Sequence, residues 1–370
     1  MRSTPTSRRL SALTRRERRQ LGGIGAAICA LHVLGWGTLV AIVVPQHLRV
    51  GATALGLGLG TTAYILGIRH AFDADHIAAI DNSTRRLIGR GEHPVSVGFW
   101  FALGHSTIVF GLALLIAIGA RSLPHQLVSG HSGVHSALVT VGTAVSGGFL
   151  YTIAALNVAA FAGIWRHFRR LRSGIHDPRA LDADLHRGGI VNRVVARIGK
   201  PIERPWHMYL VGLLFGLGFD TATEVALLVL AGTGSASGLP WYAILCLPVL
   251  FAAGMSLLDT VDGTFMNIAY GWSMSQPVRR IYYNLTVTGL SIAVALIVGS
   301  VELVGLLSDR LGLHQAPWSW AANVNLNTVG YLIVGLFFLT WLFSLLIWRY
   351  ARIEQRWAGG TDGNAAPSET

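Results

Sequence analysis

The sequence predicts an all-α, polytopic integral membrane protein with about eight transmembrane helices and both termini in the cytoplasm. Three observations support this fold class. Hydrophobic residues make up 52% of the 370 residues and charged residues only 13%, and the mean hydropathy is +0.51. The apolar residues gather in runs, most of which exceed the ~20 residues that a helix needs to cross a bilayer. The basic residues lie almost entirely in every second segment between these runs.

The apolar runs divide the chain into two groups of four expected spans. A basic arm (1–21) precedes the first group (22–165), a basic loop (166–206) separates the groups, and a tail (349–370) follows the second group (207–348). The runs 52–80 and 240–270 are longer than a bilayer requires, which leaves room for tilt or for an unwound segment. The expected spans cover residues 22–44, 52–80, 97–119, 137–165, 207–231, 240–270, 284–306 and 328–348.

The distribution of Lys and Arg predicts the orientation. With a cytoplasmic N-terminus, the cytoplasmic segments carry 25 of the 29 basic residues, against three in the outer loops and one, Arg69, inside a span. This excess follows the positive-inside rule. It explains the net charge of +11 without a nucleic-acid partner, and the loop 166–206 is expected to contact lipid headgroups. A cleaved signal peptide within 1–44 is the alternative, but the apolar region is too long and no small-x-small cleavage site follows it.

Cysteine and loop histidine residues add two smaller expectations. Cys29 and Cys246 both lie inside apolar runs, so neither a disulfide framework nor a cysteine zinc site is expected. The outer loop 119–135 carries His125, His131 and His135. These residues form either an ordinary polar loop or a weak metal-collecting surface.

The second expected span carries the strongest candidate site, in the stretch R-H-A-F-D-A-D-H-I-A-A-I-D-N from Arg69 to Asn82. Imidazole and carboxylate groups are common ligands of divalent first-row metals. The expected metal ligands are therefore His70, Asp73, Asp75 and His76. On a straight helix His70 and His76 are separated by a rise of about 9 Å, so either the helix loosens here or the residues form two stations on a path. A buried polar network that ties helices together is the structural alternative. Arg69 either neutralises part of the carboxylate charge or extends toward the membrane interface.

Later spans add ionisable residues at expected membrane depth. His105 lies in L-G-H-S-T of the third span, Asp220 and Glu224 lie one turn apart in the fifth, and Asp259 and Asp262 share a face of the sixth. Each ionised group at the centre of a bilayer costs about 2.5–3.5 kcal/mol on insertion scales. A bound divalent cation or protonation would offset that cost, which favours a cation path over a purely structural network. The L-G-H-S-T motif of the third span is weakly similar to a segment of the fifth, and D-A-D-H of the second span is weakly similar to a segment of the sixth. These similarities suggest two related halves.

These motifs together resemble the nickel/cobalt transporter family of prokaryotic and fungal permeases. The resemblance rests on H-x4-D-H at His70, Asp75 and His76, and on three later motifs in order: L-G-H-S-T (103–107), L-G-F-D-T-A-T-E (217–224) and G-M-x-x-x-D-T-x-D-G (254–263). It implies high-affinity uptake of Ni2+ or Co2+ across the cytoplasmic membrane of a prokaryote. It also implies that His70, Asp73, Asp75 and His76 govern transport and selectivity. By the same resemblance, His105, Asp220, Glu224, Asp259 and Asp262 belong to the transport route.

We therefore expect a secondary transporter that is not an enzyme, with the metal as cargo and no resident cofactor. The chain has no G-x-x-x-x-G-K-[ST] signature, so the membrane potential or a proton gradient is the expected energy source and no ATPase subunit is expected. The main alternative is a membrane-embedded metal-dependent enzyme that uses the same His/Asp cluster. It is disfavoured because H-E-x-x-H is absent. A sensor or scaffold would leave the intramembrane carboxylates unexplained. The sequence leaves the choice between nickel and cobalt and the oligomeric state open.

Overall fold

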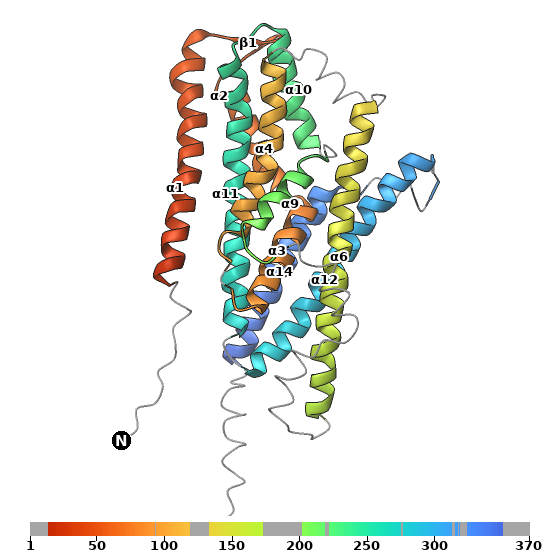
Figure 1. Cartoon of the computed structure of the whole chain (residues 1–370). Coiled ribbons are helices and arrows are strands. Elements are labelled where there is room, and N and C mark those ends of the chain that lie inside the picture. Colours follow the sequence, from red (N-terminus) through yellow and green to blue (C-terminus); the bar gives the residue numbers. More distant parts are fainter. Residues whose placement is uncertain are drawn as a thin grey trace, which may run out of the picture.

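The computed structural model describes residues 14–92, 94–118, 133–172, 202–218, 222–274, 277–312, 315–316, 318 and 324–350. These residues are almost entirely helical (Figure 1). Within them the only sheet is a short antiparallel hairpin, β1 (Arg49–Val50) and β2 (Thr53–Ala54). The α-helices are α1 (Arg15–Gly37), α2 (Leu57–His70), α3 (Ala74–Gly89), α4 (Val97–Ala117), α6 (Gly133–Arg172), α9 (His207–Phe215), α10 (Ala222–Ala236), α11 (Trp241–Met274), α12 (Pro277–Leu311) and α14 (Leu326–Tyr350). A π-helix (Thr38–Val43) and a 3-10 helix (Val44–Gln46) continue α1.

Membrane-spanning length and apolarity confirm the predicted fold class. Five described segments satisfy both requirements: Arg15–Gln46, Val97–Ala117, Ser136–Ala159, Trp241–Tyr270 and Thr288–Leu311. Two shorter apolar helices, Thr223–Ala236 and Thr328–Phe343, accompany them. Large apolar side chains face outward, as lipid contact requires; Val33 is 72% exposed and Leu332 is 69% exposed. The cytoplasmic placement of the termini and the boundaries of the arm, loop and tail remain predictions.

The second expected span is two helices rather than one. Helix α2 ends at His70, and α3 begins at Ala74. The turn between them retains local backbone hydrogen bonds, from Phe72 N–H to Arg69 O (3.1 Å) and from Asp73 N–H to His70 O (2.9 Å). Asp73 is in an extended conformation at the N-cap of α3. The helix therefore loosens between His70 and His76, which is the first of the two alternatives that the sequence left open.

The fifth expected span is also divided. Helix α9 ends at Phe215, a turn follows through Gly218, and α10 begins at Ala222. Discontinuous helices at membrane depth are tolerated where they line a site inside the protein. The breaks that end α2 and α9 lie between the two ends of the bundle (Figure 1).

The β-hairpin marks one end of the bundle, which we call the hairpin end (Figure 1). Gly51 N–H donates to Ser237 Oγ just after α10, and the Tyr242 hydroxyl on α11 donates to Gln46 after α1. The N-terminus of α2 and the C-terminus of α4 lie at the same end. Chain direction therefore alternates: α2 and α11 run away from the hairpin end, whereas α4, α9 and α10 run toward it.

A polar network connects α3 to its neighbouring helices on the side away from the hairpin end. Asp81 accepts hydrogen bonds from the hydroxyls of Tyr270 on α11 and Ser291 on α12. Arg85 donates to Thr288 on α12, and Asn157 on α6 donates to Asn82. Buried polar groups need such partners because an unsatisfied one costs about 1–3 kcal/mol. This network fixes the position of α3, the second half of the interrupted span.

Helix α14 closes the bundle against the break between α2 and α3. A Cβ atom added to Gly330 would lie 1.7 Å from the carbonyl oxygen of Phe72, so only glycine permits this approach. The Phe72 ring packs on Tyr331 at a centroid distance of 4.9 Å. The break is thus covered by a backbone contact that has no room for a side chain.

We expect Gly330→Ala to lower the thermal unfolding midpoint in detergent, because α14 must move away from Phe72. Overpacking typically costs about 1–3 kcal/mol. The matched control is Gly335→Ala on the same helix, where an added Cβ has no neighbour within 4 Å. The control should be neutral or slightly stabilising, because Ala is favoured over Gly in helices. Equal unfolding midpoints for the two variants would contradict this account of the break.

Candidate metal centre

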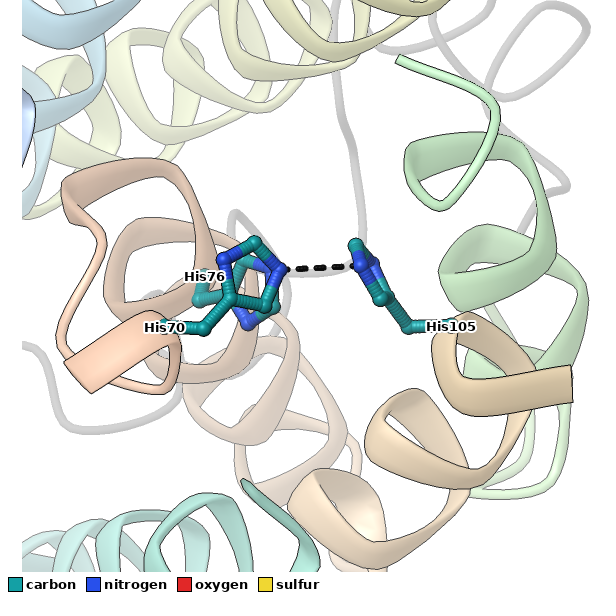
Figure 2. Close-up of side chains that lie close together, drawn as sticks. All are labelled: His70, His76 and His105. Atoms are coloured by element: carbon teal, nitrogen blue, oxygen red, sulfur yellow. Dashed lines mark hydrogen bonds between the residues drawn. The ribbon is translucent and has the colours of Figure 1, made fainter. Parts of the chain in front are cut away.

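Three histidine side chains meet in the interior of the bundle. His70 ends α2, His76 lies in the first turn of α3, and His105 lies midway along α4. Their ring centroids are 4.5, 4.7 and 4.9 Å apart. Each offers a nitrogen within 4.8 Å of the others, and all three side chains are buried. Figure 2 shows the rings facing one another across the gap between the broken span and α4. We call these three residues the histidine cluster.

The helix break produces this convergence. A continuous helix would separate His70 and His76 by about 9 Å of rise. The turn at 71–73 instead brings the ring of His76 back to that of His70, with an interplanar angle of 72°. One interrupted segment thus supplies two imidazoles, and α4 supplies the third.

Glu224 joins the cluster from α10. His70 Nε2 lies 2.9 Å from His105 Nε2, which in turn lies 2.6 Å from Glu224 Oε1. Glu224 Oε1 also lies 3.8 Å from His70 Nε2. One hydrogen on His105 Nε2 can serve only one of these two acceptors. A cation among the three atoms would engage all of their lone pairs, and this donor set suits Ni2+, Co2+ and similar borderline metals.

Two aspartates flank the outer nitrogens of the histidines. Asp73 Oδ2 lies 2.9 Å from His70 Nδ1, and Asp259 Oδ2 lies 3.6 Å from His76 Nδ1. A carboxylate on one imidazole nitrogen commonly orients the other nitrogen toward a metal. Thr223 Oγ1 also lies 3.1 Å from His70 Nδ1. Asp73 and Asp259 thus sit where they would orient the imidazoles, a role that spacing along the sequence does not reveal.

Charge balance favours a divalent cation in this cluster. Asp73, Glu224 and Asp259 are buried with exposed fractions of 1%, 1% and 0%. Buried ionised groups are costly unless they are paired. Arg69 does not supply the countercharge, because its side chain is exposed. This exposure argues against the interpretation in which Arg69 neutralises the carboxylates.

The remaining candidates have different positions. Asp75 is half-buried, and its Oδ1 accepts the backbone N–H of His76 at 2.9 Å. Asp262 lies one turn beyond Asp259 on α11. Asp220 falls outside the described residues. The same is true of the loop that carries His125 and His131, so the proposed metal-collecting surface stays a prediction.

Sequence reasoning missed Thr223 and two aromatic side chains against the cluster. Phe251 on α11 packs on His70, and Phe101 on α4 packs on His76. Thr223 directly precedes Glu224, and Phe101 precedes His105 by one turn, so their spacing was a usable signal. No comparable local signal relates Phe251 to His70.

Comparison with known proteins places this geometry in context. The model of the high-affinity nickel-transport protein family matches residues 56–347, which include the whole histidine cluster. The nickel transporter NicT of Mycobacterium tuberculosis is 55% identical over 95% of this chain and 94% of its own length. The nickel transporter NixA of Staphylococcus aureus is 43% identical, with 90% and 95% covered. The cobalt transport protein NhlF of Rhodococcus rhodochrous is 40% identical, with 90% and 94% covered. No solved structure is significantly similar to the chain.

We expect His70→Ala, His76→Ala and His105→Ala each to weaken Co2+ binding by at least about tenfold, because even the outer partners of metal ligands contribute about 10–100-fold. The d–d absorption of Co2+ titrated into detergent-solubilised protein measures this affinity. The control is His32→Ala on α1, whose ring contacts Ile28 O and the Tyr64 hydroxyl outside the cluster. Wild-type affinity in all three variants would exclude the cluster as a metal site.

Proposed function

This chain belongs to the family of high-affinity nickel-transport proteins, and we propose that it takes up Ni2+ and Co2+ across the cytoplasmic membrane of a prokaryotic cell. The observation that carries the proposal is the buried histidine cluster with Glu224, held between two interrupted membrane segments. A site of this kind at membrane depth is typical of transporters built from discontinuous helices.

The proposed roles of individual residues follow from the contacts. His70, His76, His105 and Glu224 replace water around the ion, because their nitrogen and oxygen atoms converge. Asp73 and Asp259 orient two of the imidazoles. Asp75, Asp220 and Asp262 then relay the ion or take up protons between the cluster and the membrane faces. The metal is cargo, and no resident cofactor is proposed.

The proposed energy source is the membrane potential, alone or with a proton gradient. A divalent ion gains about 4.6 kcal/mol on moving inward across 100 mV, at about 2.3 kcal/mol per charge. This free energy suffices for substantial accumulation at nanomolar external metal. With no nucleotide-binding signature in the chain, we propose that it works without an ATPase subunit. A nucleic-acid partner is also not proposed.

The enzyme alternative has less support than transport. The three relatives described above are named as transporters, and the chain has no H-E-x-x-H motif. The cluster is also fully buried, whereas a hydrolase or oxidase must admit an organic substrate. We therefore propose that the protein has no catalytic activity.

We expect cells that express the protein to accumulate 63Ni2+ and 57Co2+ at nanomolar metal with excess Mg2+, and His76→Ala to reduce uptake at least tenfold. His32→Ala should retain uptake, because His32 lies outside the cluster. The ratio of the two isotopes assigns the preferred metal. Absence of uptake of both isotopes, with the protein present in the membrane, would contradict the transport function.

In proteoliposomes we expect an inward-negative potassium diffusion potential set with valinomycin to raise the initial rate of 63Ni2+ uptake several-fold. The physical reason is the inward force on a doubly charged ion. Reversing the potassium gradient in the same vesicles provides the control. Uptake that ignores the potential in both directions would argue for another energy source.

A further inference from the structure

Two pairs of helices carry matching sequence motifs in the two halves of the chain. Helices α2 and α9 share Tyr-x-x-Gly, at Tyr64–Gly67 and Tyr209–Gly212. Helices α4 and α11 share Phe-Ala-x-Gly-x-Ser, at Phe101–Ser106 and Phe251–Ser256. The motifs occur in the same order, and each Tyr-x-x-Gly helix is the first part of an interrupted segment. The structure thus relates the second span to the fifth and the third to the sixth. The weak sequence similarities had suggested other pairs, the third span with the fifth and the second with the sixth.

The matching motifs make reciprocal contacts. A Cβ atom added to Gly67 would lie 2.1 Å from the carbonyl oxygen of Phe251, and one added to Gly212 would lie 2.1 Å from that of Phe101. The glycine on the partner helix of each crossing makes the same kind of close contact. An added Cβ on Gly254 would meet Tyr64 O at 2.6 Å, and one on Gly104 would meet Tyr209 O at 2.0 Å. The α2–α11 crossing is therefore equivalent to the α9–α4 crossing.

The two crossings point in opposite directions along the bundle. Helix α2 runs away from the hairpin end, whereas α9 runs toward it; α11 and α4 are likewise reversed (Figure 1). The two sets of helices are thus related by an axis across the bundle, which is the arrangement of an inverted repeat. Each crossing places one phenylalanine ring beside the histidine cluster.

Phe251 covers the cluster on its hairpin side. The carbonyl of Phe251 is level with Gly67, one turn nearer the hairpin end than His70. Its ring packs on the His70 ring at a centroid distance of 5.5 Å and an angle of 39°. The side chain is 0% exposed. Apolar residues of α2 and α11 fill the space beyond it toward the hairpin.

Phe101 covers the cluster on the opposite side. It lies one turn before His105 on α4, and therefore further from the hairpin end. Its ring makes a T-shaped contact with the His76 ring, with a centroid distance of 4.7 Å and an interplanar angle of 87°, and it packs on Phe215 of α9 at a centroid distance of 5.3 Å. This side chain is also 0% exposed. The histidine cluster is thus enclosed between two phenylalanines that occupy equivalent positions in the repeat.

We infer that Phe251 and Phe101 are the two gates of the transport path, and that the structure is an occluded state with both gates closed. The inference rests on the proposed transport function and assigns gating residues that the metal ligands do not reveal. An apolar ring packed against an imidazole excludes water from that side of the cluster. Displacement of the Phe251 ring together with the apolar side chains beyond it opens the cluster toward the hairpin end, and displacement of the Phe101 ring with its neighbours opens it toward the opposite end. Because the surroundings of the two rings are related by the repeat, one gate can open while the other keeps its closed packing.

The test is the sidedness of cysteine labelling. Phe251→Cys and Phe101→Cys are made separately in a background in which Cys29 and Cys246 are replaced by alanine. Oriented membrane vesicles of both polarities are treated with a membrane-impermeant thiol reagent. Ala52→Cys in the hairpin and Glu92→Cys after α3 are exposed and identify the two faces. We expect Phe251→Cys to react only from the face that labels Ala52→Cys, and Phe101→Cys only from the face that labels Glu92→Cys.

Reaction of both cysteines from one face, reaction of either from both faces, or no reaction of either would overturn the gate assignment. The labelling needs no metal transport, so failure of Ni2+ uptake would affect the proposed function without deciding the gates.

A second measurement uses the release of bound Co2+ from detergent-solubilised protein into excess chelator. Phe251→Ala and Phe101→Ala should each accelerate release at least tenfold. Phe99→Ala should not, because Phe99 packs on Trp100 and not on the cluster. An unchanged release rate in both gate variants would also overturn the assignment.

Discussion

The interruption of the second membrane segment at Ala71–Asp73 is the constraint on which the rest of this structure depends. It brings two histidines six residues apart into ring contact, which a continuous helix cannot do. A break at this depth leaves backbone groups without helical partners, and water is scarce there. The structure compensates with turn hydrogen bonds at Phe72 and Asp73 and with the backbone of α14 packed against the Phe72 carbonyl. The polar network around Asp81 then fixes α3 on the side away from the hairpin end.

The break also brings carboxyl groups and imidazoles together inside the bundle. Buried carboxyl groups on α10, α11 and the turn surround three imidazoles, and ionising such groups without a partner is costly inside a membrane. A bound divalent cation would offset that cost. Imidazole ligands with a carboxylate suit borderline metals such as nickel and cobalt more than magnesium or calcium, which prefer oxygen. The same chemistry thus favours transition metals, and a bound ion would add to the stability of the site.

The repeat gives a structural reason for two-sided access to a single site. Glycines at equivalent crossings let α2 approach α11 and α9 approach α4 to backbone contact. The rings of Phe251 and Phe101 lie beside the cluster at opposite ends of this arrangement. Packed interfaces of this kind exchange between discrete states rather than deform continuously. A transporter needs that property, because both gates open at once would dissipate the gradient.

The fold class and the chemical character of the site could be predicted from the amino-acid sequence. Hydropathy is a local property, so apolar runs are visible without tertiary structure. Ionisable residues within them stand out because their cost in a bilayer requires a function. His70, His76, His105 and Glu224 could be singled out for that reason. How these residues meet depends on tertiary packing. The position of the helix break and the contact between Phe251 and His70 could not be predicted from local patterns. The same holds for the two aspartates near His76, since Asp259 flanks its ring and Asp75 accepts its backbone N–H. Each of these depends on which distant helix packs alongside, as when Gly330 meets Phe72. Such contacts follow from shape complementarity between elements far apart in the chain, and no local pattern encodes them.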